Sequence, residues 1–223
     1  MRSPSIQAIA FLIASPVVAQ VRWIAQAFPP SPAARAYPGY AYDDARGKMV
    51  VFGGSVTGGQ VTDTWEWDGT TWLERLPTVA PSLPRSFAMT YDSARRVVVF
   101  IGGYMSGPPT VQVWEWDGLN WLYRPTPVTP TWRYGHAIIY DAARSRTVLF
   151  GGGSSLPNAE TWEWDGSAWT QLMPAVSPPP RSFHALAYDS IRQRASSIGP
   201  SPLKSIRSSV PSASTAIPLM LPG

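Results

Sequence analysis

Residues 91–103 read YDSARRVVVFIGG and carry the pattern that decides the fold of this chain. Tyr91 and Asp92 close one run of residues, Ser93–Arg95 form the expected turn, and a second, apolar run leads into Gly102. The second run is rich in β-branched and aromatic residues, which predicts a strand covered on both faces. The stretch therefore indicates two antiparallel strands joined by a tight turn.

The same pattern recurs along the chain at a period of 48 or 49 residues. Each Tyr-Asp pair is followed by a glycine, and the first three copies continue with the pentapeptide WEWDG and a further tryptophan. Such self-similarity signals stacked supersecondary units. The tyrosines are Tyr42, Tyr91, Tyr140 and Tyr188, and the repeated glycine and tryptophan positions are Gly53, Gly54, Gly102, Gly103, Gly151, Gly152, Trp65, Trp67, Trp114, Trp116, Trp162 and Trp164.

Each unit predicts four strands. Around Tyr91 the segments SFAMTY, VVVFI, VQVWEW and NWLYR provide them in order. Asp117-Gly118 predicts the hairpin between the third and fourth strands, because glycine tolerates positive φ. The glycine doublets after the second strand allow a tight bend or a close backbone approach.

Ten of the eleven tryptophans lie in the repeat register, and only Trp132 does not. We expect these side chains to pack between the units, since each indole can bury ~150–250 Å². Stacking of exposed tryptophans on sugar rings is the alternative.

The glycine doublets, the tryptophan set and the period resemble the kelch family of β-propellers, including the propeller of galactose-oxidase-like proteins. The resemblance covers about residues 20–194. It implies an all-β, kelch-type β-propeller with about three and a half four-stranded blades in an incomplete ring. The implied blades lie at about 35–75, 85–124 and 133–172, with a partial blade at 181–194 and an N-terminal strand at 20–24 that typically completes the last blade.

The repeat fails near residue 194. Residues 194–200 read RASSIGP where the preceding unit has TVLFGGG, and we expect 195–223 to be a Ser- and Pro-rich irregular tail. Three explanations stay open. The gene is truncated or read out of frame near this point, two chains combine as a homo-oligomer to complete one ring, or an open or four-bladed form stands alone.

The first 19 residues predict a signal peptide. Arg2 supplies the positive charge, residues 8–19 are mostly apolar, and residues 17–19 are small enough for cleavage before Gln20. We therefore expect a secreted protein, extracellular or periplasmic, with no stable membrane anchor after cleavage. A buried strand or a short membrane anchor is the alternative.

The charge and the amino-acid composition argue against two classes of function, nucleic-acid binding and galactose oxidase chemistry. Charged residues make up 14% of the chain and the net charge is +4, without a polybasic run, so we expect no nucleic-acid partner. The resemblance to galactose oxidase implies a tyrosine cross-linked to cysteine beside copper. The chain has no cysteine, so this cofactor cannot form. We expect no cofactor and no metal site.

Paired acidic residues recur in every WEWDG copy. A pair such as Glu66 and Asp68 could serve general acid–base chemistry of the kind used in glycoside hydrolysis. Three equivalent copies instead favour a structural role, with the aspartate in the hairpin turn and the glutamate paired with an arginine. The Asp-x-x-Arg pairs after each Tyr are likewise expected to lock turns, at Asp43/Arg46, Asp92/Arg95, Asp141/Arg144 and Asp189/Arg192.

The remaining candidate ligand-binding residues open the first strand of each unit. They are Arg35, Arg85, Arg133, His136, Arg181 and His184. The resemblance implies that this strand is innermost, so these side chains would lie near the mouth of the central channel. Guanidinium groups there could grip a carboxylate or a phosphate. Hydrogen bonding between blades is the alternative, and two histidines alone are weak grounds for a metal site.

These observations predict a non-catalytic binding or scaffold module that recognises a protein surface or an extracellular polysaccharide. A glycan-active enzyme using the Arg, His and Tyr residues of the channel mouth is the rival hypothesis. A truncated fragment without function is the third.

Overall fold

The computed structural model describes residues 30–82, 86–102 and 110–198, together with the backbone of 204–206. Their regular structure is entirely β, in four antiparallel sheets, which confirms the all-β prediction. None of the described residues belongs to a helix with the length and apolarity that a membrane span requires.

Three sheets have four strands, one has three, and in each the strands pair in chain order. The four-strand unit predicted from the repeat is thereby confirmed in its first three copies. The first sheet contains β1 (Gly39–Asp43), β2 (Lys48–Val56), β3 (Gly59–Trp67) and β4 (Trp72–Arg75); the second β5 (Phe87–Asp92), β6 (Val97–Gly102), β7 (Gln112–Trp116) and β8 (Trp121–Tyr123); the third β9 (Ala137–Asp141), β10 (Arg146–Phe150), β11 (Thr161–Trp164) and β12 (Trp169–Leu172); the fourth β13 (Ala185–Asp189), β14 (Arg194–Ile198) and β15 (Lys204–Ile206).

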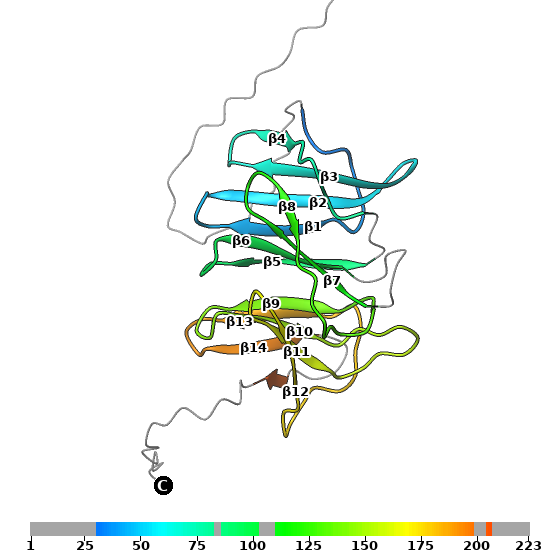
Figure 1. Ribbon diagram of the computed structural model, residues 1–223, viewed down its shortest axis with the longest axis vertical. Coiled ribbons are helices and arrows are strands. Elements are labelled where there is room, and N and C mark those ends of the chain that lie inside the picture. Colours follow the sequence, from blue (N-terminus) through cyan, green and yellow to red (C-terminus); the bar gives the residue numbers. More distant parts are fainter. Residues whose placement is uncertain (1–29, 83–85, 103–109, 199–203, 207–223) are drawn as a thin grey trace, which may run out of the picture.

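The sheets follow one another through the molecule, with the first two in the upper half of Figure 1 and the last two in the lower half. Their first strands contact each other in sequence, β1 with β5, β5 with β9 and β9 with β13. This arrangement is consistent with a β-propeller-like fold. Over the part of the chain that the structure describes, the sheets do not close into a ring.

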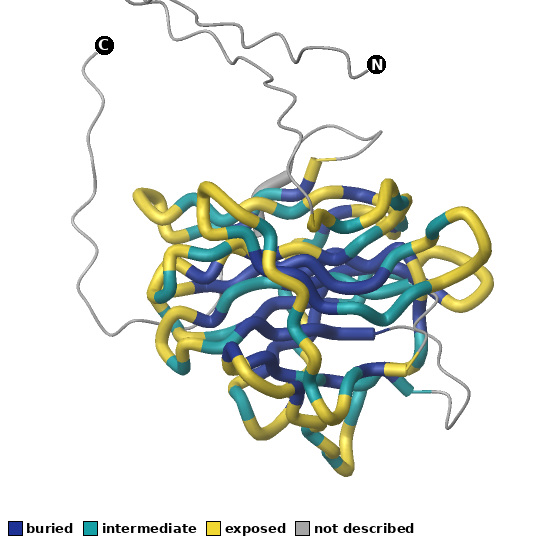
Figure 2. Tube along the Cα trace, turned by 90° about the horizontal axis from the view of Figure 1, so that it is seen from above, coloured by how far each residue is buried: buried dark blue, intermediate teal, exposed yellow. Residues whose placement is uncertain are grey.

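The core lies between successive sheets. Val50 and Phe52 of the first sheet pack against Val98, Phe100 and other side chains of the second, and similar clusters join the second to the third and the third to the fourth. Figure 2 shows these buried segments in the centre, with exposed turns around them. The apolar run of β6 is buried on both faces, as predicted.

Six tryptophans of the repeat are core residues: Trp65, Trp116, Trp121, Trp162, Trp164 and Trp169. Trp67, Trp72 and Trp114 are partly exposed, and Trp23 lies outside the described residues. Trp116 and Trp164 are fully buried, and Trp121 donates from Nε1 to Oγ1 of Thr64 in the preceding sheet at 2.9 Å. The predicted packing role is confirmed for these six buried tryptophans.

The Tyr-Asp pairs of the third and fourth sheets each tie their own sheet to the preceding one. Asp92 accepts hydrogen bonds from the backbone N–H and the Nε–H of Arg95 in its own turn, as predicted. Asp43 and Asp141 accept the same two bonds from their arginines, and Asp189 accepts the backbone N–H and an Nη1–H of Arg192. In the third and fourth sheets the tyrosine reaches the turn of the preceding sheet. The hydroxyl of Tyr140 accepts the N–H of Ala94, and the hydroxyl of Tyr188 accepts that of Ala143, both at 3.3 Å.

The acidic residues of WEWDG have the structural roles that their repetition favoured. Glu66 is buried and pairs with Arg46, Lys48 and Arg75. Asp68 accepts backbone hydrogen bonds across its hairpin turn. The equivalent residues are Glu115 and Glu163, which pair with arginines, and Asp117 and Asp165, which hold turns.

Two sequence-based boundaries need correction. β14 continues to Ile198 and 204–206 form a third strand, so the regular structure does not end at 194. Ladder hydrogen bonds come from the backbone, so serines can replace apolar residues there without ending the pairing. In the first sheet β2 also runs past its glycine doublet, with a register shift between Phe52 and Gly54. The predicted signal peptide, the strand at 20–24, Arg85 and Gly103 lie outside the described residues.

Candidate functional site: an aromatic hollow where the first strands begin

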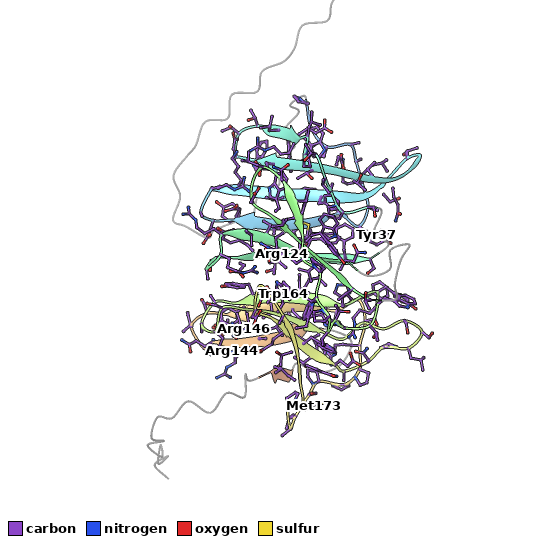
Figure 3. All side chains as sticks on the ribbon, viewed as in Figure 1. Tyr37, Arg124, Arg144, Arg146, Trp164 and Met173 are labelled. Carbon is purple, nitrogen blue, oxygen red and sulfur yellow. The ribbon has the colours of Figure 1, made fainter. Side chains whose placement is uncertain are left out.

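An open hollow of about 1080 Å³ lies at the end of the molecule where the first strands of the sheets begin. In Figure 3, Tyr37 of this end lies on the opposite side of the molecule from Arg144, in the turn before β10, and Arg146, at the start of β10. The described lining residues are Tyr37, Pro38, Tyr40, Gly54, Ser55, Gln60, Ser86, Phe87, Trp132, Tyr134, Gly135, His136, Phe183 and His184.

Two positions of the repeat supply most of this lining. The residue five before the repeated tyrosine and the residue four before it contribute from all four sheets. The hollow is therefore the place where the four units converge. The earlier position holds Tyr37, Ser86, Gly135 and Phe183, and the later one holds Pro38, Phe87, His136 and His184.

The glycine doublets make this convergence sterically possible. Gly54 has φ of 106°, and a Cβ there would lie 2.9 Å from the carbonyl oxygen of Ala36. Gly152 has φ of 73°, and a Cβ there would lie 2.8 Å from the backbone nitrogen of His136. The segment leading into the first strand can approach so closely only because these positions lack side chains.

Aromatic rings dominate the open surface of the hollow. Tyr37 is 88% exposed, Phe183 78% and Tyr40 68%. Tyr134 lies between Trp132 and Phe183, with ring centroids 6.2 and 6.1 Å away and the rings tilted by about 40°. We call Trp132, Tyr134 and Phe183 the aromatic strip. It offers a run of ring faces beside the exposed Tyr37.

The two histidines lie deeper in the hollow and are neutral at pH 7. Burial, with the nearby charge of Arg133, lowers the pKa of His136 to about 4; burial and Arg181 do the same for His184. A ring nitrogen of His136 lies 3.2 Å from the carbonyl oxygen of Ile101. The ring of His184 packs edge-on against a phenylalanine, and neither of its nitrogens has a hydrogen-bond partner among the described residues.

The described lining carries no carboxylate, guanidinium or ammonium group. Its polar groups are hydroxyls, the amide of Gln60, the imidazoles and the backbone. The described lining residues therefore offer hydrogen bonds to a ligand but no charged partner for a strong ion pair. Nowhere among the described residues do three or more His, Cys, Asp or Glu side chains form a group that could hold a metal ion.

The described arginines of the predicted site lie near the histidines but, unlike them, do not line the hollow. Arg35 donates two hydrogen bonds to Asp63, at 2.6 and 2.9 Å, and a third to the carbonyl of Gly53. Arg133 is fully buried and pairs with Glu160. Both arginines thus hold their own sheets together, and of the predicted set the histidines line the hollow.

Arg181 occupies a different place. Its guanidinium donates to Oγ of Ser197 at 3.1 Å, and the residue borders a second, smaller hollow of about 410 Å³. The aromatic residues at the mouth were not among the sequence-predicted ligand residues. Trp132 stood out only because it is the one tryptophan outside the repeat register.

Comparisons with known proteins inform the fold. No protein-family model matches the chain, and no curated protein matches it at a significant level. The solved structure of YjhT is similar over 77% of this chain and 60% of that chain, with a TM-score of 0.55 and 15% identity. The similar part therefore spans less than two thirds of YjhT. At this identity the similarity concerns the fold alone.

Proposed function

We propose that this chain is a secreted, kelch-type propeller module that binds a neutral polysaccharide in the hollow without changing it chemically. Residues 1–19 would direct its export. The observation that carries the proposal is an exposed aromatic strip within a lining that has no charged side chain among its described residues.

Sugar rings have apolar C–H faces and polar hydroxyl edges. The faces of Tyr37, Tyr134 and Phe183 can cover the apolar side of a sugar, because large aromatic surfaces gain free energy when they leave water. Exposed aromatic patches with polar surroundings typically mark ligand-binding surfaces. The exposed amide of Gln60 supplies hydrogen-bonding groups for hydroxyls at this hollow.

The absence of charge in the described lining selects between ligands. An acidic polysaccharide would lose hydration on entering the hollow without gaining a cationic partner among the described lining residues, which costs free energy. A neutral chain avoids this cost. Of the two predicted ligand classes, an uncharged polysaccharide fits the hollow better than a protein surface with charged groups.

The test is a glycan array that carries neutral and acidic polysaccharides, followed by titration calorimetry on the neutral binders. Tyr37→Ala and Tyr134→Ala should each weaken binding about tenfold, which corresponds to ~1.4 kcal/mol. Tyr123→Ala is the matched control, because Tyr123 is 43% exposed and lies outside the hollow.

A reducing-sugar assay on the same glycans completes the test. We expect no release of sugar. Binding confined to acidic glycans, or equal binding by Tyr134→Ala and the native chain, would contradict the proposal. Release of reducing sugar would support the rival hypothesis of a glycan-active enzyme.

A further inference from the structure

The first sheet has one face directed away from the second sheet, which we call the leading face. It carries Tyr42, Met49, Trp67 and Trp72, as the strand register shows. Tyr42 is 60% exposed and Met49 37%, and both tryptophans are partly exposed. The first sheet thus presents aromatic and apolar side chains that no described residue fully covers.

The same register positions are covered in the next two sheets. In the second sheet Val98, Trp116 and Trp121 are 0 to 3% exposed, because they pack against the first sheet. In the third sheet Trp164 and Trp169 are 1 and 5% exposed. The leading face therefore has the composition of a junction between sheets, but no sheet of the described residues packs on it.

The fourth sheet has the complementary surface, which we call the trailing face. It carries Ala185, Ala187 and Ile198 on its strands and Ile191 in its turn. Ile198 is 56% exposed and Ile191 90%. At internal junctions the residue equivalent to Ile198 is buried, as Phe52, Ile101 and Phe150 are.

We propose that the leading face of one copy of this chain docks on the trailing face of a second copy, head to tail. Such a contact repeats a junction that the chain already forms between its own sheets. The hydroxyl of Tyr42 would accept the N–H of Ile191 in the second copy. Tyr140 and Tyr188 accept the N–H of Ala94 and Ala143 in this way.

One feature of the internal junctions is not repeated. The strand register places Ser205 opposite Ser196, at the position that Glu66 and Glu115 hold opposite valines. The leading-face Trp67 would therefore meet no glutamate. We expect the contact between copies to be weaker than an internal junction and to depend on protein concentration. Repeated contacts of this kind close a ring of copies if the rotation between copies permits, and otherwise form an open filament.

The absence of native cysteine permits a selective cross-linking test on the full chain. Tyr42→Cys and Ile191→Cys are made separately, mixed and treated with a short bis-maleimide. The two introduced thiols are then on different copies of the chain, so a cross-link between position 42 and position 191 must join two copies. We expect a covalent dimer in the mixture, and much less of it when either variant is treated alone.

Leu119→Cys is the matched control, because Leu119 is 71% exposed and belongs to neither face. Its mixture with Tyr42→Cys should not form the dimer. Sedimentation of the native chain should show a mass that rises with protein concentration. Met49→Glu should raise the concentration at which half of the chains are associated by at least tenfold. A constant monomer mass, or equal cross-linking of the control, would overturn the proposal. The monomer result would point to residues 1–29 of the same chain as the cover of the leading face.

Discussion

The indole N–H of Trp116 donates a hydrogen bond of 3.0 Å to Oε1 of Glu66 in the preceding sheet. The same carboxylate accepts hydrogen bonds from Arg46 and Arg75. One buried group thus joins a turn and the last strand of its own sheet to the next sheet. Trp164 and Glu115 repeat the contact at the following junction, at 3.4 Å.

The charge state of Glu66 follows from these partners. Burial alone would raise its pKa, but the hydrogen bonds from Trp116 and Arg46 and the charges of the arginines outweigh burial. They hold the pKa of Glu66 below its ordinary value of 4.5. The carboxylate is therefore ionised at neutral pH and accepts hydrogen bonds on both oxygens.

Removing this carboxylate should destabilise the protein. Glu66→Ala leaves the buried indole and the surrounding cations without their acceptor, and we expect the free energy of unfolding to fall by about 2–3 kcal/mol. The expected loss of unfolding free energy is smaller than for a fully buried ion pair, because Arg46 and Arg75 remain about a quarter exposed. Urea denaturation measures the loss. The exposed Glu74→Ala is the control, and an equal effect of both changes would contradict the role of Glu66.

The histidines should make stability fall between pH 6.5 and pH 4. The pKa of His136 is about 4 in the folded chain, against 6.5 for a free side chain, so the unfolded state binds the proton first. Stability is complete above pH 6.5 and is lost as the pH falls, by roughly 3 kcal/mol for this residue. Denaturation midpoints across this range measure the loss.

His136→Phe provides the control for this pH dependence, because Phe87 holds the same repeat position in the second sheet. The variant should have a flatter profile between pH 6.5 and pH 4.5. The buried carboxylates still respond below that range, as expected from the lowered pKa of Glu66. An unchanged slope in the variant would show that His136 is not the group responsible.

The glycine doublet of the third sheet should tolerate no side chain. Gly152→Ala adds a Cβ 2.8 Å from the backbone of His136 at a residue with positive φ. Gly58→Ala shares the positive φ but meets no atom within 4 Å. We expect Gly152→Ala to lower the melting temperature clearly more than Gly58→Ala. The difference between the two melting temperatures measures the effect of the close approach of the His136 backbone to Gly152. Similar shifts in both variants would argue against that effect.

One junction lacks a hydrogen bond that its neighbour has. Trp121 donates to Thr64, but the equivalent of Thr64 at the next junction is Val113, and Nε1 of Trp169 has no partner among the described residues. Val113→Thr should therefore cost about 1 kcal/mol less in the native chain than in a Trp169→Phe background. A double-mutant cycle on unfolding free energies measures this coupling. Equal costs in both backgrounds would refute it.

Much of the fold could be predicted from periodicity. The spacing of the Tyr-Asp pairs and of WEWDG gave four-stranded units with boundaries close to β1–β12, because local turn chemistry and apolar runs determine them. The sequence pattern placed the end of regular structure at residue 194, whereas strands continue to residue 206. Pairing of β14 depends on its backbone hydrogen bonds, which the serines of that segment do not reveal.

The candidate site was predicted only in part. His136 and His184 line the hollow, as expected from their place before the first strand. Arg35 and Arg133 occupy the same region of the sequence but turn into their own sheets, toward Asp63 and Glu160. These acidic partners come from loops and strands more than twenty residues later, so no local pattern links them. Trp132 was visible only as an exception to the repeat.

A double-mutant cycle on Glu66→Gln and Trp116→Phe tests most directly whether the repeated indole–carboxylate contact joins successive sheets. Unfolding free energies of the native chain, both single variants and the double variant give the coupling. The contact predicts a coupling of about 1–2 kcal/mol in favour of the native pair. Additive effects, with no coupling within error, would contradict it.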